Sequence, residues 1–181
     1  MSLRVLVDAF EHHGWATSRL IDTCLGLSPE QLETAVPGTY GSILDTMRHL
    51  VDGDATYLVW LTGDRTHAMR TDEMDPGELR DAIGRDGVAW SAFLARDADP
   101  GQIVKDVDEA GWERDASVGI RLAQALHHGT DHRSQICTAL TALGIEPPAI
   151  DVWAFGVDTG RVADSPPPSE DPPATPTDRA G

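Results

Sequence analysis

Two histidines four residues apart are the residues of this chain whose type and spacing point most directly to chemistry. His128 and His132 lie within residues 126–136, a stretch that otherwise has the pattern of an α-helix. Side chains at positions i and i+4 share one helical face, with Cβ atoms about 5–6 Å apart. Two imidazoles at this spacing can chelate one divalent metal ion. A third ligand from elsewhere would complete a reactive site that keeps open coordination positions.

The best candidate for the third ligand is His49, in a second predicted helix. Its flank of that helix carries small and aromatic residues, which suit the wall of a pocket better than a close-packed seam. Tyr57 and Trp60 lie on this flank, and with Trp15 they are predicted to line the pocket. His13 falls in the apolar stripe of the first predicted helix, where it is interpreted as a core or pocket-lining residue. Since histidine exchanges protons near pH 7, His13 is also a candidate proton relay.

A purely structural interpretation stands beside the metal hypothesis. A chain with seven histidines produces a helical pair four apart easily by chance, and the imidazoles would then only fill a polar core. By itself, His49 is better interpreted as a hydrogen-bonded buried histidine. The carboxylates of Asp52 and Asp131 can orient ligating imidazoles, although Asp131 is favoured as a solvated surface acid. The remaining histidines are interpreted as surface residues: His12, His67 and His127.

The elements that must position these side chains are helices. Apolar residues recurring at steps of three and four predict long helices over residues 2–25, 42–61, 76–95 and 117–143. Shorter elements are predicted as a capped turn at 28–40, an extended or hairpin segment at 99–115 and an amphipathic piece at 150–157. The expected fold is all-α, a four-helix bundle with one long crossover, formed by residues 1–161. Residues 162–181 hold six of the chain's 12 prolines and are predicted to be a disordered tail.

Composition limits the partners that are plausible. The formal net charge is −16, and the last 21 residues contribute only two basic and four acidic side chains, so the folded body itself is acidic. Such a body repels nucleic-acid phosphates and anionic lipid. No stretch approaches the ~20 apolar residues of a membrane span, and no signal-like segment begins the chain. We therefore expect a cytoplasmic protein with no nucleic-acid or membrane partner. Its two cysteines, Cys24 and Cys137, are expected to be reduced.

Three motifs together carry a resemblance to a known family. They are His12-His-Gly-Trp15, Gly41-Ser-Ile-Leu-Asp-Thr-Met-Arg-His-Leu50, and His128-Gly-Thr-Asp-His-Arg-Ser-Gln135 followed by Leu143-Gly-Ile. On these motifs the chain resembles the DinB/YfiT-like superfamily over residues 3–157. Ser134 stands where that family commonly has glycine, a position expected on the outer surface. The resemblance implies a four-helix bundle, often a homodimer, with one divalent metal ion bound by His49, His128 and His132.

The resemblance also implies a class of activity. Members with assigned activities include S-transferases and isomerases that use low-molecular-weight thiols. A thiol bound to Zn²⁺, Ni²⁺ or Fe²⁺ at three neutral imidazoles would lose its proton and attack an electrophile. The expected partners are thus a small-molecule thiol and an electrophile. Hydrolysis by a metal-bound hydroxide is the less favoured chemistry. The alternative is a non-catalytic stress protein that binds a metal or a small ligand.

Overall fold

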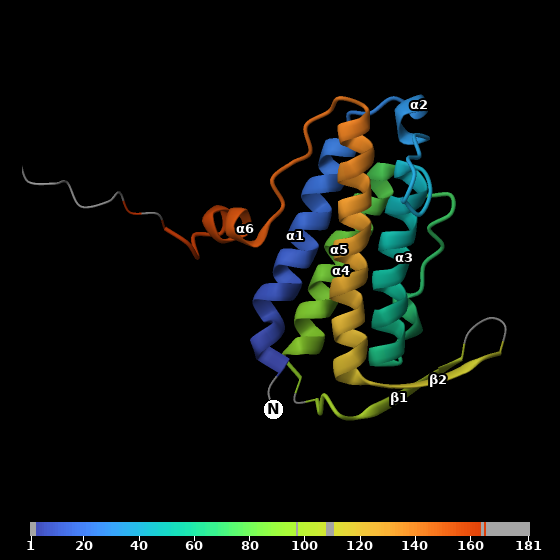
Figure 1. Cartoon of the computed structure of the whole chain (residues 1–181). Coiled ribbons are helices and arrows are strands. Elements are labelled where there is room, and N and C mark those ends of the chain that lie inside the picture. The colour runs from blue at the N-terminus through green and yellow to red at the C-terminus, as the bar shows by residue number, and fades with distance from the viewer. Residues whose placement is uncertain (1–2, 97, 108–110, 164, 166–181) are drawn as a thin grey trace, which may run out of the picture.

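Four long helices form a bundle in the computed structural model, which describes residues 3–96, 98–107, 111–163 and 165 (Figure 1). These helices are α1 (Val7–Cys24), α3 (Ile43–Thr62), α4 (Pro76–Leu94) and α5 (Val118–Ala142). The shorter elements are η1 (Leu3–Leu6), α2 (Pro29–Leu32), η2 (Arg65–His67), β1 (Ile103–Val107), β2 (Glu113–Ser117) and α6 (Val152–Asp158). The fold expected from the apolar periodicity is therefore confirmed as mainly α-helical.

Side chains at the helix ends explain where the helices begin and stop. Ser42 and Asp45 form a reciprocal capping box at the start of α3, which satisfies backbone N–H groups that have no partner inside the helix. Asp75 and Glu78 form the same arrangement at the start of α4. At the other end of α3, Gly63 has φ 72°, a left-handed conformation that glycine adopts without steric cost. The residues next to the boundary thus determine that α3 begins one residue after Ser42.

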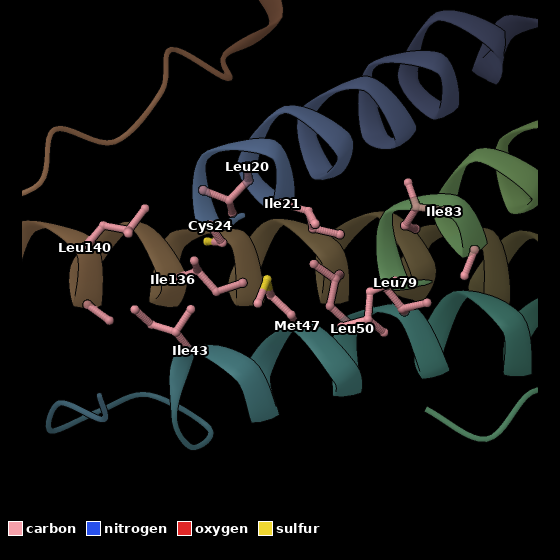
Figure 2. Close-up of a cluster of buried hydrophobic side chains, with 13 residues drawn as sticks. Leu20, Ile21, Cys24, Ile43, Met47, Leu50, Leu79, Ile83, Ile136 and Leu140 are labelled. Atoms are coloured by element: carbon pink, nitrogen blue, oxygen red, sulfur yellow. The ribbon is translucent and has the colours of Figure 1, made fainter. Parts of the chain in front are cut away.

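Two apolar clusters fix the directions of the helices. One joins the end of α1 to the start of α3, the start of α4 and the end of α5, through Cys24, Ile43, Leu79 and Leu140 (Figure 2). The other cluster joins the opposite ends of the same helices. Hence α1 and α5 run parallel to each other, and α3 and α4 run the other way. The link over residues 63–75 must return along the whole bundle, and this link is the predicted long crossover (Figure 1).

The expected short elements differ from the structure mainly at their ends. The extended segment is an antiparallel hairpin, with β1 paired to β2 from Ile103↔Ser117 to Val107↔Glu113. The first helix begins as the 3-10 turn η1 rather than as a regular α-helix. Both cysteines are free thiols, as expected. Among the described residues, no helix combines the length and apolar character needed to cross a bilayer.

The predicted tail falls almost entirely outside the described residues. Of residues 162–181 the structure describes only 162, 163 and 165. Val162 still belongs to the fold, because its backbone N–H donates to the carbonyl of Gly156 at 2.9 Å. The disorder of the remaining tail, and the domain boundary after Arg161, stay predictions.

Candidate metal centre

Helices α3 and α5 bring three imidazoles together between them. His49 comes from α3, and His128 and His132 come from successive turns of α5. Each ring offers one nitrogen atom, and the three nitrogens lie within 4.8 Å of one another. The Nε2 atoms of His49 and His128 are 3.2 Å apart. Because α3 packs directly against α5, the helical pair predicted from spacing and the third ligand predicted from its flank meet at one point.

The surroundings of His128 and His49 favour the neutral imidazole, which is the form that binds a metal. Burial, together with the neighbouring His132 and His49, lowers the pKa of the His128 imidazole to about 4. Burial and His132 also lower the pKa of His49. Only a neutral imidazole has a lone pair to donate. Two neutral rings whose Nε2 atoms are 3.2 Å apart either share one hydrogen or direct both lone pairs at one cation. The donor set therefore fits a divalent ion.

Gln135 orients the ring of His132. The Nδ1–H of His132 donates to Oε1 of Gln135 at 3.2 Å, which leaves Nε2 for a metal ion. The same oxygen accepts the backbone N–H of Tyr40 at 2.8 Å. The ring of Tyr40 in turn stacks on His49, with centroids 4.0 Å apart and planes within 4°. One amide group thus holds a ligand from α5 and the residue that covers a ligand from α3, as expected of outer-sphere partners of a metal site.

Two helical glycines accommodate the histidines of facing helices. A Cβ atom on Gly53 would lie 2.4 Å from Cε1 of His128, and one on Gly129 would lie 2.2 Å from Cε1 of His13. Asp54, the neighbour of Gly53, accepts a hydrogen bond from Nε2–H of His13 at 2.7 Å. These contacts link two adjacent residues of α5 to two adjacent residues of α3. His128 packs on Gly53, while the next residue, Gly129, packs on His13, which bonds the residue after Gly53, Asp54. The position of the ligand ring and that of the buried histidine are therefore coupled.

The structure places His13 in the core behind the ligands. It is 1% exposed. Its Nδ1 accepts a hydrogen bond from Arg133 at 3.0 Å, while Nε2–H donates to Asp54. Arg133 also donates to Thr17 at 3.1 Å. With both ring nitrogens bonded inside the protein, His13 matches its interpretation as a core residue. Its role as a proton relay stays a prediction.

The comparison with known families agrees with this geometry. A sequence model of the DinB family matches residues 1–160, which is most of the chain. The chain belongs to the DinB family. None of the curated proteins compared with it matches. Family membership and the three-histidine cluster together fit a metal-binding DinB-like protein.

The other residues predicted for the site of this DinB protein fall in different places. Tyr57 contacts His128 with ring centroids 6.0 Å apart, and Trp60 packs against Tyr57 at 5.5 Å. Trp15 lies against His12, with ring centroids 6.1 Å apart, and not against the three candidate ligands. Two residues after His13 it lies about 200° further round α1, where Nε1–H donates to Asp158 at 2.8 Å. The pocket predicted from three aromatic residues therefore keeps two of them.

The remaining polar residues divide between surface and interior. Asp131, His127 and Ser134 are exposed, as interpreted. His12, interpreted as a surface residue, is half-buried, and its Nε2–H donates to the carbonyl of Ile150 at 2.8 Å where the chain returns beside α1. Asp52 is half-buried and lines a hollow next to His49.

This hollow lies directly beside the candidate metal centre of the DinB chain. Its volume is about 860 Å³, within the range of small-molecule sites. His49 and Tyr40 line it, together with charged groups of both signs that include Arg48, Arg70 and Asp52. Sequence reasoning did not find Tyr40 or this hollow. Tyr40 and part of the wall of the hollow lie in the irregular links before and after α3, and hydrophobic periodicity does not predict the path of such links.

Proposed function

We propose that the chain binds one divalent metal ion through His49, His128 and His132 and acts as a thiol-dependent S-transferase. The single observation that carries this proposal is the convergence of three imidazole nitrogens within 4.8 Å. The lowered pKa values of His128 and His49 favour the neutral forms of these two rings. Three histidines without a fourth protein ligand are typical of catalytic rather than structural metal sites. Among the described residues, no further histidine, cysteine or carboxylate joins this group.

When bound, the ion supplies a strong positive charge that stabilises a thiolate over a thiol. In the transfer reaction the sulfur forms a bond to an electrophilic carbon, whose leaving group departs with the bonding electron pair. The proton of the thiol passes to a base in solution. Imidazole ligands suit Zn²⁺, Ni²⁺ and Fe²⁺ alike, so metal content has to be measured.

The chain's own cysteines are poor nucleophiles for such a reaction. Burial raises the pKa of Cys24 to about 12, and its side chain lies in the core cluster at the end of α1. Burial also raises the pKa of Cys137. Since thiolates and not thiols are nucleophilic, the reacting sulfur is better supplied by a small molecule. The hollow beside His49 has room for one.

Protein residues have the task of holding the reactants and ligands in place. Gln135 fixes the ring of His132 through Nδ1, and Tyr40 covers one face of His49. Gly53 leaves the space that the His128 ring occupies. A geometry fixed before the reactants arrive avoids reorganisation during the reaction.

Elemental analysis of protein purified without an affinity tag tests the metal centre. We expect one divalent ion per chain, lost on substitution of His49, His128 or His132 by alanine. His127→Ala is the matched control, because His127 is exposed on the same helix, and it should leave metal content unchanged. Full occupancy in His49→Ala would show that the third ligand is wrong.

A panel of thiols and electrophiles tests the reaction. Turnover should require both metal and thiol and should rise with pH as the thiol ionises. His13→Ala should lower turnover without removing metal if His13 relays protons. Equal rates with and without thiol would favour hydrolysis by a metal-bound hydroxide. Full metal occupancy with no turnover would favour the non-catalytic binding protein.

A further inference from the structure

A second hollow is enclosed by α3, β2 and the start of α5. It has a volume of about 330 Å³. Tyr57 forms part of its wall, and the same ring contacts His128 of the candidate metal centre at 6.0 Å. His49 itself lines the first hollow, whereas the second reaches the centre through Tyr57. Because the two hollows share no lining residue, two reactants can occupy them without competing for space.

The wall of this second hollow is suited to a flat apolar molecule. The rings of Tyr57 and Trp60 meet edge to face at 5.5 Å. Ile120, which is 64% exposed, adds an aliphatic surface. The guanidinium of Arg121 lies over the Trp60 ring at 5.0 Å. Aromatic rings and guanidinium planes both stack well on planar ligands.

The charged side chains that line this hollow are basic, although the protein as a whole is acidic. The chain carries a net charge of −16, and the charged groups among the described residues lining the hollow are the guanidiniums of Arg114 and Arg121. Since Asp106 pairs with Arg121 behind the wall, Arg114 provides the positive charge that a ligand would meet. In the hollow beside His49, by contrast, Asp45, Asp52 and Asp72 accompany the arginines. A local positive charge in an acidic protein favours an anionic ligand at that place.

Arg121 is held in place inside the wall. It is 3% exposed, and its Nη2 donates to the carboxylate of Asp106 and to the carbonyls of Val104 and Arg114. Its Nε is buried as well, so a ligand in the hollow does not reach that nitrogen. Arg121 therefore contributes a fixed guanidinium plane over Trp60, and Arg114 is the arginine left to meet an anionic group.

We propose that this hollow binds a planar, largely apolar molecule with one carboxylate or similar anionic group, and that this molecule is the electrophile of the transfer reaction. The ligand's role as electrophile rests on the proposed function, whereas the ligand class rests on the hollow alone. The apolar ring system lies against Trp60 and Tyr57, the anionic group faces Arg114, and the reactive end faces Tyr57 on the side of the metal centre.

Calorimetry with two matched probes tests the site without any turnover. 2-Naphthoate is the planar anion, and 2-naphthylmethanol has the same ring system without the charge. We expect the full chain to bind naphthoate about tenfold more tightly than the alcohol, as a hydrogen-bonded charge would produce. Equal affinities, or no saturable binding of either probe, would overturn the proposal.

Two variants locate the binding. Trp60→Leu should weaken both probes about fivefold through the lost ring contact. Arg114→Gln should weaken naphthoate and leave the alcohol unchanged, and it avoids disturbing the buried Arg121–Asp106 pair. The controls are Trp153→Leu, which replaces a ring that is 74% exposed on α6, and Arg65→Gln on the crossover. Naphthoate affinity that is unchanged in both test variants would place the site elsewhere and overturn the proposal.

The same titrations separate this site from the proposed metal function. They are run on the protein as purified and after treatment with a chelator. If the protein binds naphthoate but is found to bind no metal ion, the proposed ligand site is correct and the proposed metal function is wrong. One bound metal ion per chain with no naphthoate binding would leave the metal centre intact and disprove the ligand class.

Discussion

The imidazole of His128 lies against the backbone of Gly53, where a Cβ atom would be 2.4 Å from its Cε1. Glycine inside a helix costs about 0.5–1 kcal/mol relative to alanine. Helix α3 therefore carries a local weakness at the position where His128 of α5, a candidate ligand, needs room. Gly129 of α5 makes the same provision for His13, so each helix opens a space for a histidine of its neighbour.

Gly53→Ala should disrupt the metal centre while the bundle remains folded. The added methyl group must displace the His128 ring, so we expect metal affinity to fall about tenfold or more, measured by competition with a chelating dye. Gly84→Ala is the control, since Gly84 is exposed in α4 and a Cβ there meets nothing within 4 Å. It should keep full metal affinity and gain roughly 0.5–1 kcal/mol of stability. Unchanged affinity in Gly53→Ala would contradict the proposed position of His128.

Gln135→Leu should weaken metal binding without removing a ligand. The substitution deletes the acceptor for Nδ1–H of His132 and for the backbone N–H of Tyr40. Loss of such outer contacts typically costs 10–100-fold in metal affinity. Ser134→Ala, at the exposed neighbouring position, should have no effect. If both variants bind metal equally well, Gln135 does not orient the ligand.

The three candidate ligands could be predicted from the sequence because helices have a fixed period. His128 and His132 are neighbours wherever α5 is helical, and His49 followed from the small and aromatic residues of its flank. Gly53 also left a signal, since a glycine inside a helical pattern is costly relative to alanine and points to a packing or functional reason. Tyr40 left none, because it lies in the irregular segment before α3, whose path depends on tertiary contacts.

Errors arose where neighbours in sequence were treated as neighbours in space. Trp15 follows His13 by two residues and therefore points away from it round the helix. The sequence alone indicates a surface position for His12, which is half-buried in the structure. The chain after α5 comes back to cover it, and its ring bonds the carbonyl of Ile150. A contact between residues 138 positions apart has no trace in local periodicity.

The buried His13–Asp54 pair should make a larger contribution to stability than an exposed ion pair. Both side chains are 1% exposed, so removing the donor leaves a buried carboxylate poorly compensated. In a double-mutant cycle of His13→Leu and Asp54→Asn, we expect a coupling energy of about 1–3 kcal/mol from urea unfolding. The corresponding cycle on the exposed Lys105–Glu113 pair should give about 0.2–1 kcal/mol. Additive effects at His13 and Asp54 would mean that their hydrogen bond contributes nothing to stability.

Asp86 introduces a second buried carboxyl group into the same bundle. It lies on α4 and is 2% exposed, and its Oδ2 has no hydrogen-bond partner within the described residues. Burial raises the pKa of Asp86 to about 7, and the nearby charge of Asp54 adds to the shift. Between the pKa of an unfolded chain, about 3.9, and this value, the folded protein holds one more proton than the unfolded one.

Stability should therefore fall as the pH rises from about 4 to about 7, because folding is favoured where the folded state binds more protons. Asp86→Asn removes this dependence. At pH 8 we expect the free energy of unfolding of Asp86→Asn to be roughly 2–4 kcal/mol larger than that of the unmodified chain. This difference should narrow steadily toward pH 4. Urea unfolding at a series of pH values measures both curves. Asp81→Asn, an exposed acid on the same helix, should run parallel to the unmodified chain. A constant gap between Asp86→Asn and the unmodified chain would show that the Asp86 carboxyl does not titrate in this range.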